Sequence, residues 1–231
     1  MTEQEIEGGF IFLIDKDLNW TSFDVVNKMR YAMKVKKVGH AGTLDPLATG
    51  LVIVCAGRAT KQIESLVATE KEYTGTFRFG ATTPSYDLET EIDAEFPVDH
   101  IDSDLIYTTA QNFIGEQMQI PPMYSALKVN GKKLYELARK GKEIEVAARP
   151  VEIKEFEITE IRMPEIAFRV VVSKGTYIRS LVYDFGKKCS SGAHLSSLRR
   201  TRVGNFKIED ALTIPNWIEW WKKRLEELPS S

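Results

Sequence analysis

The sequence predicts an α+β fold. Residues 73–79, 151–161 and 165–173 alternate apolar and polar side chains, as half-buried strands do. Between residues 25 and 33, by contrast, apolar positions recur at the spacing of a helix. Strands and helices do not alternate strictly along the chain, so a doubly wound parallel sheet is not expected.

The other expected elements follow in chain order. Residues 9–13 form a short strand, and Thr21 or Ser22 then caps a helix. Its apolar positions are Val25, Val26, Met29 and Met33. Residues 51–56 are a continuous apolar run, typical of a buried strand. Helices are expected at 60–69, 106–113, 177–188 and 217–228, a strand pair at 151–161 and 165–173 around Met163-Pro164, and a last short strand at 203–206.

Composition excludes several classes of protein. With 231 residues, 43% hydrophobic and 28% charged, the chain has the make-up of a globular protein with a substantial core. No apolar run approaches the roughly 18–20 residues of a membrane span, and the acidic N-terminus does not resemble a signal peptide. The two cysteines, Cys55 and Cys189, cannot form a disulfide framework or a multi-cysteine zinc site. A cytoplasmic location is therefore expected.

The charges are segregated along the chain, although the net charge is only −2. Residues 87–105 contain eight acids and no Lys or Arg. Residues 121–150 contain seven basic residues against three acids, and residues 185–207 contain six basic residues and no acid. Such segregation favours a positive face that attracts a polyanion, but solvated surface segments would give the same pattern.

Asp45 is the first candidate for chemistry. It lies in a segment bounded by Gly39 and Gly50 that also contains Gly42, and Pro46 biases it toward an extended conformation. An Asp-Pro pair is also a common start of a helix. Gly50 would end such a helix after barely a turn, yet the residues alone leave a helix cap and a functional acid equally open.

Arg179 is the second candidate. If Thr176 caps a helix that begins at Tyr177, the guanidinium lies in the first turn, against the helix dipole. This placement indicates a partner carboxylate, a phosphate or a substrate. An arginine that extends into solvent or pairs with a surface acid is the alternative.

Tyr73 and His40 are further candidates. Tyr73 begins an alternating strand and is either a core residue or a surface on which a base stacks. His40 stands beside Gly39 and has no other ligand at a metal-binding spacing, so no metal site is expected. The scattered histidines do not support a hydrolase triad, and no glycine-rich nucleotide motif is present. No cofactor is therefore predicted.

Residues 121–141 mix tyrosines with lysines and arginines, a combination that suits an RNA backbone and stacked bases.

Together these segments resemble the TruB-type tRNA pseudouridine synthases, whose motifs they match in order over about residues 9–215. The five motifs are Gly39-His-Ala-Gly-Thr-Leu-Asp-Pro-Leu-Ala-Thr-Gly-Leu51, Lys71-Glu-Tyr73, Pro121-Pro-Met-Tyr-Ser-Ala-Leu-Lys128, Lys174-Gly-Thr-Tyr-Ile-Arg179 and Gly192-Ala-His-Leu-Ser-Ser-Leu-Arg-Arg200.

The resemblance implies a mixed, largely antiparallel sheet with flanking helices and a central cleft. It also implies isomerisation of uridine 55 in the tRNA T arm without metal or cofactor. By motif, Asp45 is the catalytic carboxylate, Tyr73 stacks on the target base and acts in proton removal, and Arg179 pairs with Asp45. His40 displaces or replaces the flipped uridine, while Tyr177 and Leu198 line the uridine pocket.

Residues 121–149 match the RNA-gripping insertion of the family. The RNA-binding residues expected from this insertion and from the last motif are Lys128, Lys132, Lys133, Arg139, Arg199 and Arg200. One catalytic domain over residues 9–228 is expected, acting as a monomer on tRNA without an obligate protein partner.

Two departures from the family pattern stand out. The usual Lys-Pro-x-Gly near the start is replaced by Lys16-Asp-Leu-Asn-Trp20, so that loop is expected to differ in shape. A C-terminal PUA domain, which many relatives carry, is not expected. The remaining alternatives are a tRNA-binding or folding module without catalysis and a guide-RNA-directed relative.

Overall fold

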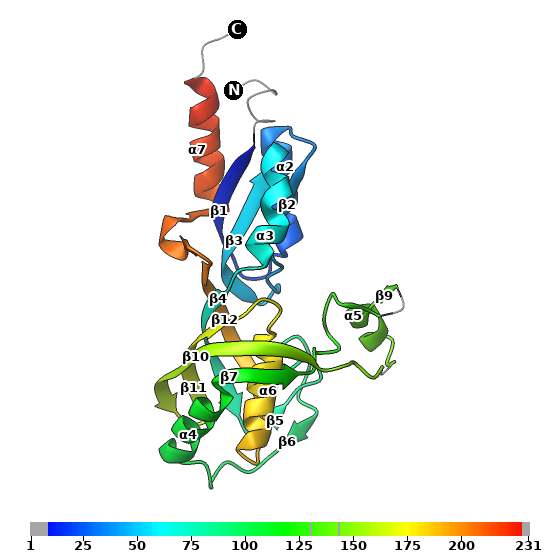
Figure 1. Ribbon diagram of the computed structural model, residues 1–231, viewed down its shortest axis with the longest axis vertical. Coiled ribbons are helices and arrows are strands. Elements are labelled where there is room, and N and C mark those ends of the chain that lie inside the picture. The colour runs from blue at the N-terminus through cyan, green and yellow to red at the C-terminus, as the bar shows by residue number, and fades with distance from the viewer. Residues whose placement is uncertain (1–8, 130, 143, 228–231) are drawn as a thin grey trace. The chain divides into compact units, whose positions relative to one another are not determined.

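The computed structural model describes residues 9–129, 131–142 and 144–227 (Figure 1). The chain forms two compact units. The first unit comprises the residues up to Tyr73 and those from Arg199 onward, and the second comprises Thr74–Leu198. A single domain over 9–228 stays a prediction, and Leu228 lies outside the described residues.

The first unit is built on strand β1 (Phe10–Lys16). β1 pairs antiparallel with β3 (Ala48–Ala56) and parallel with β14 (Leu212–Thr213). β2 (Val38–His40) pairs antiparallel with the last residues of β3. Side chains alternate along β1, and three of those on its inward face are buried: Phe12, Ile14 and Lys16.

Helices cover this unit. α2 (Ser22–Met33) begins at Thr21, whose hydroxyl and the Asp24 carboxylate form a capping box. The four apolar positions predicted for this helix are all buried. α7 (Ile214–Glu226) packs beside β1, and Trp217 and Trp221 of α7 stack at 5.7 Å between ring centroids (Figure 1).

The helix expected at 60–69 is two short pieces, the 3₁₀ turn η1 (Gly57–Gln62) and α3 (Ile63–Val67). None of the α3 residues is buried. The segment therefore has no buried apolar stripe that would stabilise a longer helix by packing.

The second unit is a sheet with the strand order β12-β4-β11-β10-β7. β10 (Arg149–Arg162) and β11 (Glu165–Val172) form the antiparallel pair predicted around Met163-Pro164. β4 (Lys71–Phe79) confirms the other alternating run, and β7 (Gly115–Gln119) is an edge strand that was not predicted.

β12 (Ala193–Val203) corrects the expected last strand. Residues 203–206 are not a strand but the turn that joins β12 to β13 (Phe206–Lys207). β12 was missed because its serines and arginines are typical of a polar loop. Its buried polar side chains, such as His194 and Arg200, are satisfied by hydrogen bonds to backbone carbonyls.

Two helices pack in the second unit, α4 (Ser103–Phe113), capped by Asp102, and α6 (Ile178–Lys188). Aromatic side chains from strands and helices fill its core: Phe77, Phe79, Phe113, Phe156, Phe168 and Phe185. Two short hairpins, β5 (Ala81–Thr82) with β6 (Ala94–Glu95) and β8 (Lys128–Val129) with β9 (Lys132–Lys133), and helix α5 (Leu134–Ala138) complete it.

These elements confirm the α+β class and a mixed sheet in which the described pairings are antiparallel apart from β1 with β14. Among the described residues, no helix is both long enough and apolar enough to span a bilayer.

Candidate functional site

Asp45 lies in the loop that joins β2 to β3 and is half-buried. Its carbonyl accepts a hydrogen bond from the amide of Ala48, at 3.1 Å between nitrogen and oxygen. Asp45-Pro46 therefore opens a single reverse turn that leads directly into β3, not a helix. This excludes the helix-cap alternative that the sequence left open.

The main chain on both sides of Asp45 is tied to the start of α2. The Ser22 hydroxyl accepts a hydrogen bond from the Leu44 amide at 2.9 Å and donates one to the Leu44 carbonyl at 3.3 Å. The Asn19 amide donates to the Pro46 carbonyl at 2.8 Å. The residues before and after Asp45 are thus held by the segment in which the sequence departs from the family pattern, together with the helix start that follows it.

Lys16 is a buried cation beside this loop that sequence reasoning did not single out. Its side chain is fully buried, and its ammonium donates to the carbonyls of Trp20 at 2.7 Å, Asp17 at 3.0 Å and Pro46 at 3.5 Å. Burial lowers the pKa of Lys16 to about 8, and the negative charge of Asp45 opposes this shift. The inward parity of Phe12 and Ile14 was the signal that could have found it.

Arg200 is buried as well, with 1% of its surface exposed. Its guanidinium donates to the carbonyls of Leu51 at 2.7 Å, Gly42 at 3.2 Å and Thr43 at 3.3 Å. The expectation that Arg200 contacts RNA does not fit this position, because its donors are directed at the loop around Asp45 and not at solvent.

His40 and Tyr73 belong to the same unit as Asp45. His40 is half-buried at the end of β2, and its Nδ1 is buried without a hydrogen-bond partner. Burial lowers the pKa of His40; the backbone of Gly42 opposes this shift, and the positive charge of Arg200 adds to it. Tyr73 lies on the buried face of β4 with 8% of its surface exposed.

Arg179 belongs to the second unit, in the first turn of α6. Its side chain is 4% exposed, its Nε lies 3.5 Å from Oδ2 of Asp87, and its Nη1 donates to the Ser85 carbonyl at 3.2 Å. The partner carboxylate that its place near the helix start indicated is thus present. Nothing in the sequence separates Asp87 from the other acids of its acidic stretch.

Helix α6 begins one residue later than expected, with Tyr177 as its N-cap and no side-chain cap. The Thr176 hydroxyl donates instead to the Ser173 carbonyl at 3.0 Å. Two hydrogen bonds with the Gln119 amide group clamp Tyr177: Tyr177 N to Oε1 at 2.8 Å, and Nε2 to Tyr177 O at 3.0 Å. The guanidinium carbon of Arg149 lies 4.8 Å from the centre of the Tyr177 ring, so ring and backbone are both fixed.

Leu198, the last residue of the second unit, is buried on β12 with 9% of its surface exposed.

The predicted RNA-gripping insertion contains hairpin β8–β9 and helix α5, which lie to one side of the sheet of their unit (Figure 1). Lys128, Lys132 and Arg139 are exposed there, and Lys133 is half-buried. Arg139 pairs with Glu89 at 2.8 Å. Arg199 belongs to the first unit, and its guanidinium donates to both carboxylate oxygens of Asp15 at 2.7 and 3.0 Å.

Sequence reasoning missed a basic hollow of about 430 Å³ in the first unit. Its lining comes from the segment after α2 and from η1, and it contains four basic residues and no acid: Lys36, Lys37, Arg58 and Lys61, with Val35, Gly57 and Thr60. The four cations are all exposed, so they are available to an anion. They are split between two short stretches of sequence, which is why no run of basic residues revealed them.

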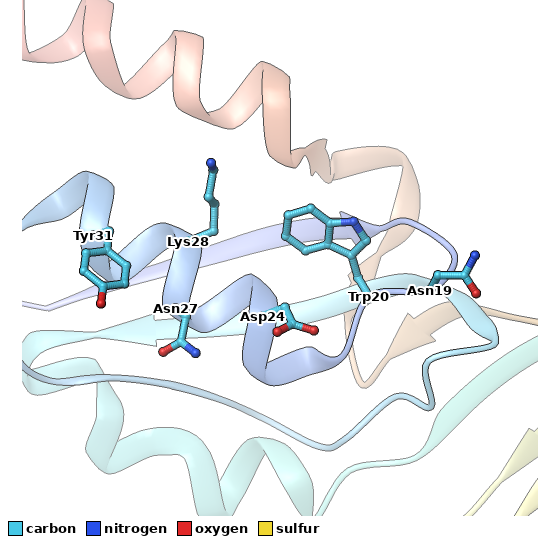
Figure 2. Close-up of a pocket in the computed structure, with 6 residues that line it drawn as sticks. All are labelled: Asn19, Trp20, Asp24, Asn27, Lys28 and Tyr31. Atoms are coloured by element: carbon cyan, nitrogen blue, oxygen red, sulfur yellow. The ribbon is translucent and has the colours of Figure 1, made fainter.

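A second hollow lies on the outer surface of α2, and Figure 2 shows its residues: Asn19, Trp20, Asp24, Asn27, Lys28 and Tyr31. Here one acid stands against one cation, and the Asp24 carboxylate is engaged in the capping box. This surface therefore lacks the charge preference of the basic hollow.

Within the described ranges, no group of three or more His, Cys, Asp or Glu side chains could hold a metal ion.

Comparison with solved structures identifies the fold. A chain from "Crystal Structure of a Cbf5-Nop10-Gar1 Complex" superposes with a TM-score of 0.75 at 29% identity, over 97% of this chain and 59% of that one. The present chain thus spans less than two thirds of that protein.

Curated relatives match over nearly their whole length. tRNA pseudouridine synthase B of Flavobacterium johnsoniae is 56% identical over 221 residues, covering 93% of this chain and 96% of the relative. tRNA pseudouridine synthase B of Phocaeicola vulgatus is 52% identical over 227 residues, covering 95% and 97%.

Two family models divide the chain between them. Residues 30–178 match the TruB family pseudouridylate synthase (N terminal domain), and residues 179–228 match the tRNA pseudouridylate synthase B C-terminal domain. Fold and matches together define a pseudouridine synthase, as the sequence resemblance implied. The chain belongs to the TruB family.

Proposed function

We propose that this chain isomerises uridine to pseudouridine in tRNA, and that its target is position 55 in the T arm. One observation carries the reaction and the substrate class: a relative named tRNA pseudouridine synthase B matches over 96% of its length at 56% identity. The T-arm position rests on the five ordered motifs, of which the loop around Asp45 is the most specific.

Asp45 is the proposed nucleophile. The reaction breaks the N1–C1′ bond, turns the base and forms a C5–C1′ bond, and the proton on C5 is finally lost to solvent. A carboxylate serves by adding to the sugar C1′ or to C6 of the base, and both routes need it ionised and oriented. The turn at Ala48 and the Ser22 and Asn19 hydrogen bonds, which hold the neighbouring main chain, support this role.

Arg179 and Tyr73 are proposed to complete the catalytic group. A guanidinium near a carboxylate favours its ionised form, which is the role that the family motif assigns to Arg179. The ion pair with Asp87 and the bond to Ser85 fix the direction of this guanidinium. Tyr73 is proposed to stack on the target base and to act in removal of the C5 proton.

Three further residues are proposed to hold the target nucleotide. His40 would occupy or open the space of the flipped uridine, and Tyr177 and Leu198 would line its pocket. Extrusion of a base costs a few kcal/mol, so contacts elsewhere on the RNA must compensate. The clamped ring of Tyr177 is a rigid surface suited to this task.

The tRNA backbone is proposed to contact basic surfaces in both units. In the second unit these residues are Lys128, Lys132, Lys133 and Arg139. In the first unit they are Arg199 and the basic hollow, whose lining carries four cations and no acid. Phosphate contacts supply sequence-independent affinity, which suits a substrate class with a common shape. The enzyme is proposed to act as a monomer in the cytoplasm.

The decisive experiment replaces one carboxylate. Asp45→Asn should abolish pseudouridine formation in an unmodified tRNA transcript and leave tRNA affinity within a few fold. Asp17→Asn, an exposed acid of the same unit, is the matched control and should retain activity. If unsubstituted protein binds tRNA but modifies none, the chain is a binding module. If it needs an added guide RNA, it is a guide-directed enzyme.

A second experiment tests the insertion. Replacing Lys132, Lys133 and Arg139 by Gln should weaken tRNA binding and flatten its dependence on salt, by up to about 0.7–0.9 per lost phosphate contact. Lys222→Gln, at an exposed position of α7, is the control. An unchanged salt slope in the triple variant would move the RNA surface away from the insertion.

A further inference from the structure

Arg200 closes the loop around Asp45 from both ends. Its Nη atoms donate to Gly42 and Thr43, which precede Asp45, and its Nε donates to Leu51, which follows it. The guanidinium thus connects the two ends of a segment that has Asp45 between them. The hydrogen bonds from Ser22 and Asn19 hold its middle, at Leu44 and Pro46.

The surroundings of Arg200 fit this task and not the binding of a phosphate. A buried guanidinium is tolerated when its donors are satisfied, and here each of its three nitrogens has a backbone carbonyl. Its backbone packs so closely against Gly50 that a Cβ added there would lie 2.3 Å from the Arg200 carbonyl oxygen. Strand β12 therefore fits the loop through both the backbone and the side chain of Arg200.

We propose that Arg200 is a positioning residue, whose rigid three-point contact with the loop fixes the orientation of the Asp45 carboxylate. This inference rests on the proposed catalytic role of Asp45. Arg200 does not touch the substrate; it acts through the main chain that carries Asp45. A misplacement of about 1 Å at a reacting group can cost roughly 100-fold in rate, so the loss of such a contact should appear in the chemical step.

The test is Arg200→Lys, which keeps the positive charge but cannot reach three carbonyls at once. The single-turnover rate at saturating tRNA should fall by about 100-fold, while tRNA affinity stays within about threefold and its salt slope is unchanged. Arg202→Lys is the matched control. Arg202 lies two residues further along β12, and its guanidinium donates to Glu70 and to the Gly204 carbonyl, away from the loop. It should retain the rate of the unsubstituted protein.

Ser22→Ala gives a second variant that releases the same loop at Leu44, and it carries the test if Arg200→Lys fails to fold. Its rate should fall in the same direction with tRNA affinity preserved. A normal rate in a folded Arg200→Lys protein, or a loss of tRNA affinity equal to the loss in rate, would overturn the proposal. So would a normal rate in Ser22→Ala if Arg200→Lys does not fold.

Hydrogen exchange separates this inference from the proposed function. The amides of Leu44 and Ala48 are hydrogen-bonded within the loop region and report its opening. Both should exchange faster in Arg200→Lys than in Arg202→Lys, and equal exchange would refute the positioning role. Inactivity of the unsubstituted protein would instead refute the proposed reaction, and the exchange rates would then still show whether Arg200 holds the loop.

Discussion

Gly50→Ala tests the fit between the Asp45 loop and β12. Gly50 has φ +104°, a conformation that costs a residue with a side chain of order 1–3 kcal/mol. The new Cβ would also lie 2.3, 2.8 and 3.0 Å from the O, N and C atoms of Arg200, all of them backbone atoms that cannot rotate away. Overpacking of this kind costs about another 1–3 kcal/mol. The free energy of unfolding should therefore fall by about 2–6 kcal/mol.

Gly42→Ala is the control for the backbone term. Gly42 lies in the same loop at φ +92°, but the nearest atom to its added Cβ would be Nη1 of Arg200 at 3.7 Å, an ordinary contact. It should lose only about 1–3 kcal/mol. Urea unfolding followed by tryptophan fluorescence measures both, since all four tryptophans belong to the unit that contains this loop. Equal losses in the two variants would refute the close fit.

Three further predictions concern buried charges and the basic hollow. Asp87→Ala leaves the buried Arg179 guanidinium without this carboxylate and should cost about 3–5 kcal/mol of stability by circular dichroism; a loss below about 1 kcal/mol would contradict the ion pair. Burial lowers the pKa of Lys16 from 10.5 to about 8, so the unfolded chain binds more protons between these pH values, and the stability of the unsubstituted protein relative to Lys16→Met should rise with pH there. A flat difference in urea midpoints would contradict it. Replacing Lys36 and Arg58 of the basic hollow by Gln should weaken tRNA binding and lower its salt slope by up to about two, and an unchanged slope would exclude the hollow.

The periodic elements could be predicted from the sequence because packing and local pattern agree in them. α2 shows this best: its predicted cap is Thr21, and its apolar positions are all buried. β12 could not be predicted, because it buries His194 and Arg200, and only the folded chain supplies the carbonyls that make this burial tolerable. The short strands β5 and β6 carry too few residues for a period to be visible.

The candidate site divides in the same way. Asp45, Tyr73 and Arg179 could be named because ordered motifs mark them. Lys16 could not, since its parity on β1 points inward while its residue type is typical of the surface. Asp87 lies in a run of acids, and only the fold selects it as the partner of Arg179. Arg200 was expected to bind RNA because of its charge, and its burial reverses that interpretation.

The central claim is that Asp45 carries out uridine isomerisation in tRNA. The most direct measurement maps pseudouridine in an unmodified tRNA transcript after incubation with the unsubstituted chain, Asp45→Asn or Asp17→Asn, with tRNA affinity measured in parallel. The unsubstituted chain and Asp17→Asn should convert position 55, and Asp45→Asn should bind the transcript and leave it unmodified. Conversion by Asp45→Asn would contradict the assignment of the nucleophile.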